Sequence, residues 1–178
     1  KNIKAEGISM PLTLYGDETE RVTLKIEDSE INLKENFGSE FIRAANYDKS
    51  LKKEYLLEIL ARNYGKNYEI NDIKKNGFGK YYIENGPEFS FTHVGEYLIT
   101  AVSDSPVGID AEEIKTVFKP VTIFGVAASS AKEYAALYTK AEAVIKYMAD
   151  KKAVDLKDVD LSSSPLVLGE TLDANVFT

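Results

Sequence analysis

Two long helical stripes of apolar residues, separated by alternating segments, are the feature that most constrains the fold of this chain. The first stripe lies in residues 50–64 and ends at Gly65, a residue type that commonly terminates helices. The second covers about residues 131–150. Between them, residues 89–92 and 97–102 alternate apolar and polar side chains, which is typical of half-buried strands. The pattern predicts an α+β fold with two main helices and six or more strands.

The N-terminal region predicts a β-hairpin. Residues 12–15 are mostly apolar and end at Gly16-Asp17, and residues 22–26 alternate apolar and polar side chains. The connection between the two segments is longer than the tightest two-residue turns. We therefore expect two antiparallel strands joined by a loose turn.

The central region predicts further strands. Residues 65–79 are rich in Asn, Lys and Gly and are expected to form a loop with one short strand. Residues 103–106 predict a turn that leads from 97–102 into a strand at 107–110. Three consecutive antiparallel strands are therefore expected here. The clearest break in the pattern follows at residues 162–165.

Length and charge limit the classes of protein to which the chain can belong. Its 178 residues suit one domain or two small halves. The net charge of −7 disfavours non-specific nucleic-acid binding, which needs a basic surface. No apolar run is long enough to span a membrane. The absence of cysteine excludes disulfides and zinc–thiolate sites, and it agrees with the cytoplasmic location that we expect.

Two acidic residues lie at the end of the predicted strand at 107–110 and just beyond it. Asp110 and Glu112 are two positions apart, so on a strand their side chains point to the same face. Paired carboxylates suit Mg²⁺, which takes one or two carboxylates together with water and phosphate oxygens. The alternative is a solvated strand end, where acidic pairs are common.

A second pair lies on the second predicted helix. Glu142 and Lys146 are four positions apart, a spacing that commonly forms an exposed ion pair. Both residues fall at the edge of the apolar stripe, where a side chain can face a cleft, whereas Lys140 projects nearly opposite to Glu142. The pattern therefore leaves two alternatives open: an ion pair on the helix surface, or two side chains that face a cleft.

Two further residues are candidates for binding an anion. His93, the only histidine, follows the strand at 89–92 and precedes Gly95. A hydrogen-bonded histidine at a strand end is the alternative to a functional one. Lys80 follows Gly79 and could reach a phosphate, although this pair of residues is weak as a motif.

The order and spacing of these residues resemble the 4′-phosphopantetheinyl transferases, of the surfactin-synthetase-activating type. The resemblance rests on Gly79-Lys80, on the run 89–93, on Gly-Ile-Asp-Ala-Glu at 108–112, and on Tyr138 followed by Glu142 and Lys146. It implies one domain over residues 1–178 with two similar α+β halves, about 1–93 and 94–178. This pseudo-dimeric fold packs each antiparallel sheet with a long helix, and a monomer is expected.

The resemblance also implies an activity. Members of this family move the phosphopantetheine arm of coenzyme A to a serine of an acyl or peptidyl carrier protein and release adenosine 3′,5′-bisphosphate. By analogy, Asp110, Glu112 and Glu142 would bind Mg²⁺. Glu142, or a metal-bound water beside it, would take the serine proton, and Lys146 would stabilise or protonate the leaving phosphate. The partners implied are coenzyme A and a carrier protein.

The family pattern assigns further residues to coenzyme A. His93 and Lys80 match positions that contact its phosphates, Thr92 retains a hydroxyl beside the histidine, and Lys49 or Lys52 stands for a basic residue upstream. The chain departs from the pattern where it has Tyr138 for Trp, Ala141 for Lys, Tyr81 for Pro and Val94 for Ser.

Three interpretations therefore remain open on the sequence. The chain is an active transferase, a family member that binds coenzyme A or a carrier domain without catalysis, or an unrelated acidic domain. The last predicts that Asp110, Glu112 and Glu142 lie far apart. In addition, residues 114–119 mix apolar and basic side chains, which fits either a carrier contact or packing beneath the second helix.

Overall fold

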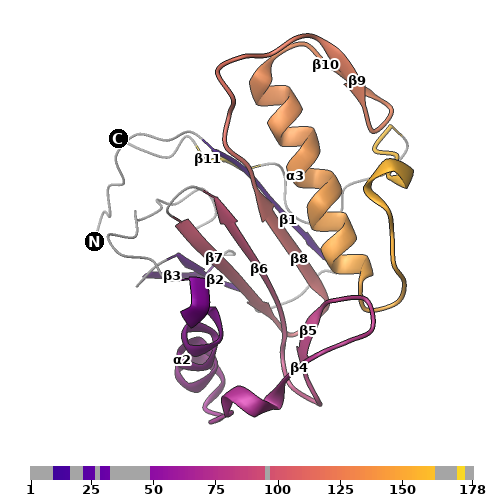
Figure 1. Cartoon of the computed structure of the whole chain (residues 1–178). Coiled ribbons are helices and arrows are strands. Elements are labelled where there is room, and N and C mark those ends of the chain that lie inside the picture. Colours follow the sequence, from indigo (N-terminus) through magenta and orange to yellow (C-terminus); the bar gives the residue numbers. More distant parts are fainter. Residues whose placement is uncertain are drawn as a thin grey trace.

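Two larger antiparallel sheets, each packed by one long helix, make up most of the described chain (Figure 1). The computed structural model describes residues 10–16, 22–26, 29–32, 49–94, 97–162 and 172–174. The strands of the two larger sheets are β1 (Met10–Gly16), β2 (Val22–Ile26), β3 (Ser29–Asn32), β6 (Glu88–Val94), β7 (Tyr97–Ser103), β8 (Val107–Ala111) and β11 (Leu172–Ala174). The sequence prediction of an α+β fold with two main helices is confirmed.

The first unit, here the α2 unit, contains the sheet β3-β2-β7-β6 and helix α2 (Lys52–Tyr64). The 3₁₀ turn η1 (Lys49–Leu51) precedes α2, and Gly65 ends the helix with a left-handed backbone (φ 62°), as its sequence position predicted. A short hairpin of β4 (Ile73–Lys75) and β5 (Tyr81–Ile83) follows η2 (Ile70–Asp72) and supplies the expected short strand.

Apolar packing holds the α2 unit together. Leu56, Ile59 and Leu60 of α2 are fully buried and belong to the cluster of Phe89 from β6 and Val102 from β7. The buried residues of β4 and β5 complete this core. The apolar stripe predicted from the sequence is therefore the face that α2 presents to its sheet.

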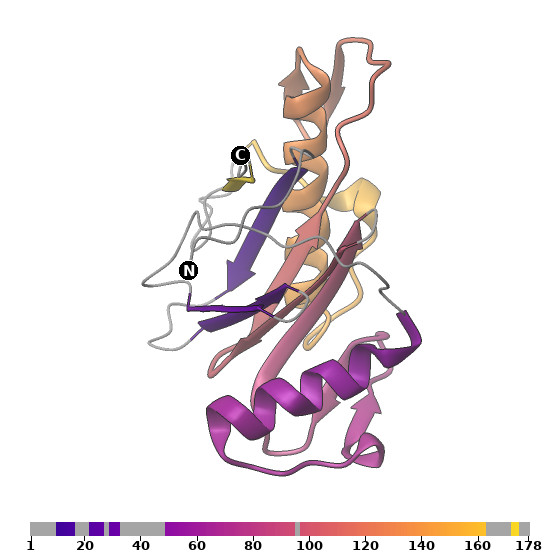
Figure 2. The same ribbon diagram turned by 90° about the vertical axis from the view of Figure 1, so that its left-hand side faces the viewer.

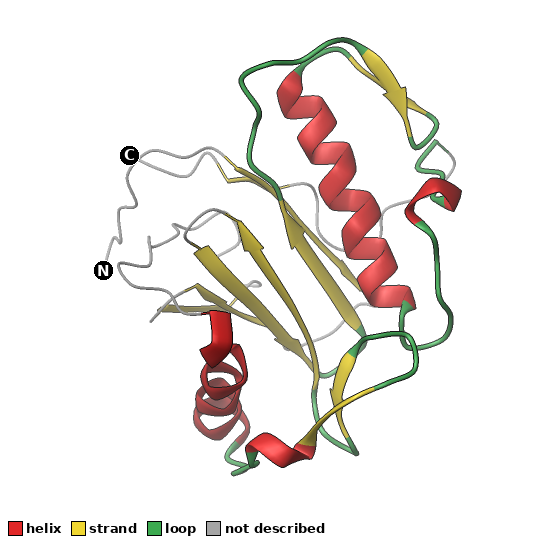
Figure 3. Ribbon diagram, in the orientation of Figure 1, coloured by secondary structure: helices red, strands yellow, loops and turns green. Residues whose placement is uncertain are grey.

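The second unit, here the α3 unit, contains the sheet β11-β1-β8 and helix α3 (Ala131–Met148). The Ser130 hydroxyl accepts a hydrogen bond from the Glu133 N–H and so caps the start of α3. The hairpin of β9 (Val121–Ile123) and β10 (Val126–Ala128) lies near the start of the helix, and η3 (Leu156–Asp158) follows its end (Figure 3).

Small residues allow α3 to approach its sheet closely. Ala135, Thr139 and Ala143, spaced four residues apart on one face, are all buried. Gly108 of β8 lies directly beneath, where an added Cβ would overlap the Ala143 carbonyl oxygen. Figure 2 shows α3 lying along β1 and β8 while α2 crosses the opposite end of the molecule.

Two predicted strand pairings are wrong. β1 and β2 both form, but they do not pair with one another: β1 lies between β8 and β11, and β2 lies between β3 and β7. The β6–β7 hairpin is confirmed, whereas β8 pairs with β1 rather than with β7. A turn signal locates a chain reversal, but burial decides which strands pair, and all five residues of β8 are buried.

The two larger sheets do not follow the expected boundary between residues 93 and 94. β7 belongs to the sheet of the α2 unit, and β1 belongs to the sheet of the α3 unit. Each sheet therefore draws strands from both sides of that boundary. Among the described helices, none combines the length and apolarity needed to cross a membrane.

Candidate functional site

Asp110 occupies a buried position near the end of β8. Its side chain is only 8% exposed, and its Oδ1 accepts hydrogen bonds from Lys146 Nζ (2.7 Å) and from Thr92 Oγ1 (3.0 Å). Its other oxygen, Oδ2, is buried without a hydrogen-bond partner in the part of the chain that the structure describes. A buried carboxylate oxygen without a donor is unfavourable and is suited to accept a cation.

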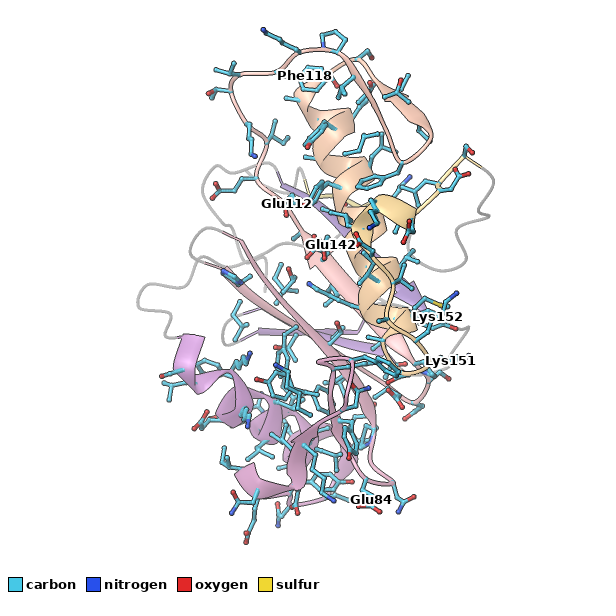
Figure 4. The ribbon with its side chains drawn as sticks, turned by 45° about the vertical axis from the view of Figure 1, so that its right-hand side comes forward. Glu84, Glu112, Phe118, Glu142, Lys151 and Lys152 are labelled. Carbon is cyan, nitrogen blue, oxygen red and sulfur yellow. The ribbon has the colours of Figure 1, made fainter. Side chains whose placement is uncertain are left out.

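Glu112 and Glu142 are the acidic neighbours of Asp110. Figure 4 shows Glu112, just beyond β8, and Glu142, on α3, near one another. Burial, and next the Asp110 carboxylate, raise the pKa of both glutamates, and Glu142 further raises the pKa of Glu112. Burial, and next the Glu142 carboxylate, also raise the pKa of the Tyr138 phenol. The three acids predicted from the sequence therefore lie close enough to influence one another electrostatically.

A cavity of about 380 Å³, here the acidic cavity, adjoins this cluster. Its walls come from α2, β6, β7, the end of β8, and α3. They are formed by Lys52, Phe91, Thr92, His93, Leu98, Asp110, Ala111, Glu112 and Lys146. Basic and acidic candidates from four separate stretches of sequence thus share one cavity, with the exposed His93 at its wall.

The residues at the acidic cavity match a hard cation in kind. Carboxylate oxygens are the ligands that Mg²⁺ prefers, and Asp110 Oδ2 offers one without a competing donor. Among the described residues, no three acidic, histidine or cysteine side chains are already arranged to hold a metal ion. Glu112 and Glu142 are only partly buried, and a change of side-chain rotamer would be needed for them to share one cation with Asp110.

Lys80 lies outside the acidic cavity. Its side chain is 7% exposed, and its ammonium group contacts Asp150 Oδ2 (2.6 Å) and Glu88 Oε2 (3.6 Å). Lys80 lines a neighbouring cavity of about 270 Å³, and Lys52 and Lys146 also line this cavity. The structure therefore places Lys80 in a buried ion-pair network at the end of α3 and not beside Asp110.

The remaining predicted contacts differ in position. Lys52 reaches the acidic cavity and also lies 4.7 Å from the centre of the Tyr81 ring. Thr92 lines the cavity, but its hydroxyl donates to Asp110 and accepts from the Ala111 N–H (3.3 Å), so its described contacts are within the protein. Lys49 begins η1, and its side chain lies outside the described structure.

A third cavity, of about 450 Å³, lies between residues 112–121 and the first turns of α3, and we name it the aromatic groove. Glu112 and Tyr138 belong to its wall, as do Phe118 and Tyr134. The Tyr134 ring stacks near Tyr138 (6.1 Å between ring centres) and lies as close to Phe118. Glu112 borders both cavities, so the aromatic groove and the acidic cavity meet there.

The sequence prediction did not include the aromatic groove as a cavity. Phe118 packs against α3 through Tyr134, whereas its neighbour Val117 is 83% exposed. Residues 114–119 therefore include both a side chain that packs against α3 and a side chain that is exposed to solvent. The β9–β10 turn was also missed, although Gly125 was its signal: Phe124 and Gly125 both have positive φ angles (54° and 77°).

Comparisons with models of known families, with curated proteins and with solved structures produce no match for this chain.

Proposed function

We propose that this protein is a divalent-metal-dependent transferase that moves the phosphopantetheine arm of coenzyme A to a serine of an acyl or peptidyl carrier protein. The observation that carries the proposal is the proximity of Asp110, Glu112 and Glu142 beside the acidic cavity. Asp110 and Glu112 line the cavity together with Lys146, His93 and Lys52. The sequence motifs that resemble the family contribute five of these residues, and Lys52 lies upstream of the motifs.

The two structural units support the same proposal. Each unit consists of an antiparallel sheet and one long helix, as the family fold would require, although the strands are divided differently from the expected halves about 1–93 and 94–178. The acidic cavity takes walls from α2 and from α3, so it lies where the two units meet. A junction between two structural units is a common place for a ligand.

The charges at the acidic cavity suit the reaction chemically. Asp110, Glu112 and Glu142 would hold Mg²⁺, which when bound would offset the negative charge of the coenzyme A diphosphate. His93 is exposed and Lys52 lies at the same cavity, so both can approach the nucleotide phosphates.

Glu142 is suited to accept a proton. Its carboxylate lies beside Asp110, and burial raises its pKa in the metal-free protein. In the proposed step, the serine oxygen forms a bond to the β-phosphorus while the bond between that phosphorus and the bridging diphosphate oxygen breaks. Glu142 takes the serine proton, and adenosine 3′,5′-bisphosphate leaves.

A mass-spectrometric transfer assay tests the proposal. The wild-type protein, coenzyme A, Mg²⁺ and a panel of apo-carrier proteins should give carriers heavier by one phosphopantetheine arm, and EDTA should abolish the product. Glu142→Gln should lower the rate by about 10²- to 10⁴-fold, the usual contribution of a general base. Glu84→Gln, at an exposed ion pair with Lys74, is the matched control and should retain activity.

Two outcomes would contradict the transferase. Coenzyme A binding without modification of any carrier would favour the non-catalytic alternative, in which the protein only binds coenzyme A or a carrier domain. Tyr138 and Ala141, at which the chain departs from the family pattern, would then be the residues to examine. No binding of coenzyme A in calorimetry would remove both the transferase and this alternative.

A further inference from the structure

Strands β6 and β8 lie side by side without a backbone ladder between them. In the described chain they belong to different sheets, and side chains bridge the two strands instead. The Ile109 N–H donates to Ser90 Oγ (3.2 Å), and the Ala111 N–H donates to Thr92 Oγ1 (3.3 Å). The partner residue number increases by two on both strands from one hydrogen bond to the next, so the strands run in the same direction. We name this side-chain junction between the two units the seam.

Lys146 of α3 closes the same junction. Its Nζ lies 3.1 Å from the Phe91 carbonyl oxygen of β6 and 3.0 Å from the Ile109 carbonyl oxygen of β8. Asp110 Oδ1, at 2.7 Å, is its third acceptor. An ammonium group has three N–H donors, so these three acceptors occupy all of them. One residue therefore joins both strands and the buried carboxylate.

This geometry conflicts with the role that the family resemblance implies for Lys146. To donate to a leaving phosphate, the ammonium group would have to release one of its three acceptors. Asp110 is the acceptor with the most to lose, because its side chain is 8% exposed whereas that of Lys146 is 30% exposed. Removing the partner of a buried charge is strongly destabilising.

We infer that Lys146 is a positioning residue: it clamps the seam and serves as the internal counter-ion of Asp110 until a divalent cation binds there. The cation would then take over the neutralisation of Asp110. This inference rests on the proposed function for the identity of the cation, whereas the clamp rests on the hydrogen bonds alone. Lys146 is therefore assigned to assembly of the site and not to proton transfer.

Thermal unfolding with and without Mg²⁺ tests the assignment. Without Mg²⁺, Lys146→Met should lower the Tm by about 5 °C, as expected for loss of a partly exposed ion pair with a buried acid in a chain of this size. Mg²⁺ alone should recover at least half of this loss, and its effect should be larger than in the wild type. Lys140→Met, on the same helix, is the control and should change neither quantity.

A double variant keeps the test decisive. Asp110→Asn combined with Lys146→Met removes the buried charge together with its partner, so it should be more stable than Lys146→Met alone. Lys146→Met could be unfolded without Mg²⁺. In that case the inference is supported if Mg²⁺ folds this variant, or if the double variant with Asp110→Asn is folded. A chain that stays unfolded in both cases contradicts it.

Other outcomes separate this inference from the proposed function. A Tm and a Mg²⁺ response equal to those of Lys140→Met would overturn the positioning role and return Lys146 to the leaving phosphate. If Mg²⁺ shifts no variant and the wild type modifies no carrier, the proposed function fails. In that case the metal-free Tm values and the double variant still decide whether Lys146 is the clamp.

Discussion

At the scale of single residues, the acidic cluster is a place where folding brings like charges together. Burial is the main reason that the pKa values of Glu112 and Glu142 are raised, and the neighbouring Asp110 carboxylate adds to it. A carboxyl whose pKa is higher in the folded state opposes folding once it is ionised. The cluster therefore lowers stability at neutral pH in exchange for a site that can attract a cation.

The first prediction concerns Glu142→Gln in the absence of divalent cations. Removing the ionisable group should raise the Tm at pH 7.5 by about 2–4 °C, as expected for roughly 1 kcal/mol in a chain of this size. The pKa of Glu142 in the folded state lies above its unfolded value of about 4.3. Wild-type stability therefore falls as the pH rises from the unfolded pKa to the folded pKa. The difference between variant and wild type should therefore shrink as the pH is lowered and disappear below about 4.3. Calorimetry across this pH range is the measurement, and a difference independent of pH would contradict the explanation.

At the scale of elements, the close packing of α3 on β8 places Glu142 and Lys146 beside Asp110. The helix approaches because Ala135, Thr139 and Ala143 are small, and Gly108 has no side chain to keep it away. The sequence predicted the helix and the strand from their periodicity. It did not predict their separation, because helical spacing identifies the apolar face of a helix but not the partner against which that face packs.

The second prediction tests this contact. Gly108→Ala should destabilise the protein by about 3 kcal/mol, the upper part of the usual range for overpacking, since its Cβ would come within 2.6 Å of the Tyr147 backbone nitrogen. Gly77→Ala is the matched control, because no atom lies within 4 Å of its added Cβ. Chemical denaturation of the two variants gives the comparison. Equal stabilities would show that α3 can shift away from β8 without loss.

At the scale of the whole molecule, the aromatic groove lies beside the acidic cavity and meets it at Glu112. The groove has aromatic walls, and Lys115 and Lys119 line it together with Glu112 and Glu113. Under the proposed function, the aromatic rings and the two lysines of the groove are the residues that would contact a carrier domain, whose surface is usually acidic. Under the proposed function, a carrier placed there would lie next to Glu112 of the acidic cluster.

The third prediction follows from this arrangement. Phe118→Ala should raise the KM for the carrier by roughly fivefold, the effect of losing about 1 kcal/mol of contact, and should leave the affinity for coenzyme A unchanged. Phe78→Ala is the control, because Phe78 is 50% exposed and lies on the loop between β4 and β5. Steady-state kinetics with both substrates varied is the measurement. A carrier KM that does not change would remove the groove from carrier binding.

The sequence by itself determined the two helices, most of the strands and the identity of the acidic residues, because these depend on local periodicity and spacing. Only the tertiary structure decided that β1 pairs with β8, that Lys80 joins Asp150 instead of the candidate site, and that Lys146 spans the seam. These contacts join residues that are distant along the chain. They are selected by burial and by the need to satisfy buried charges, and neither requirement is visible in a local pattern.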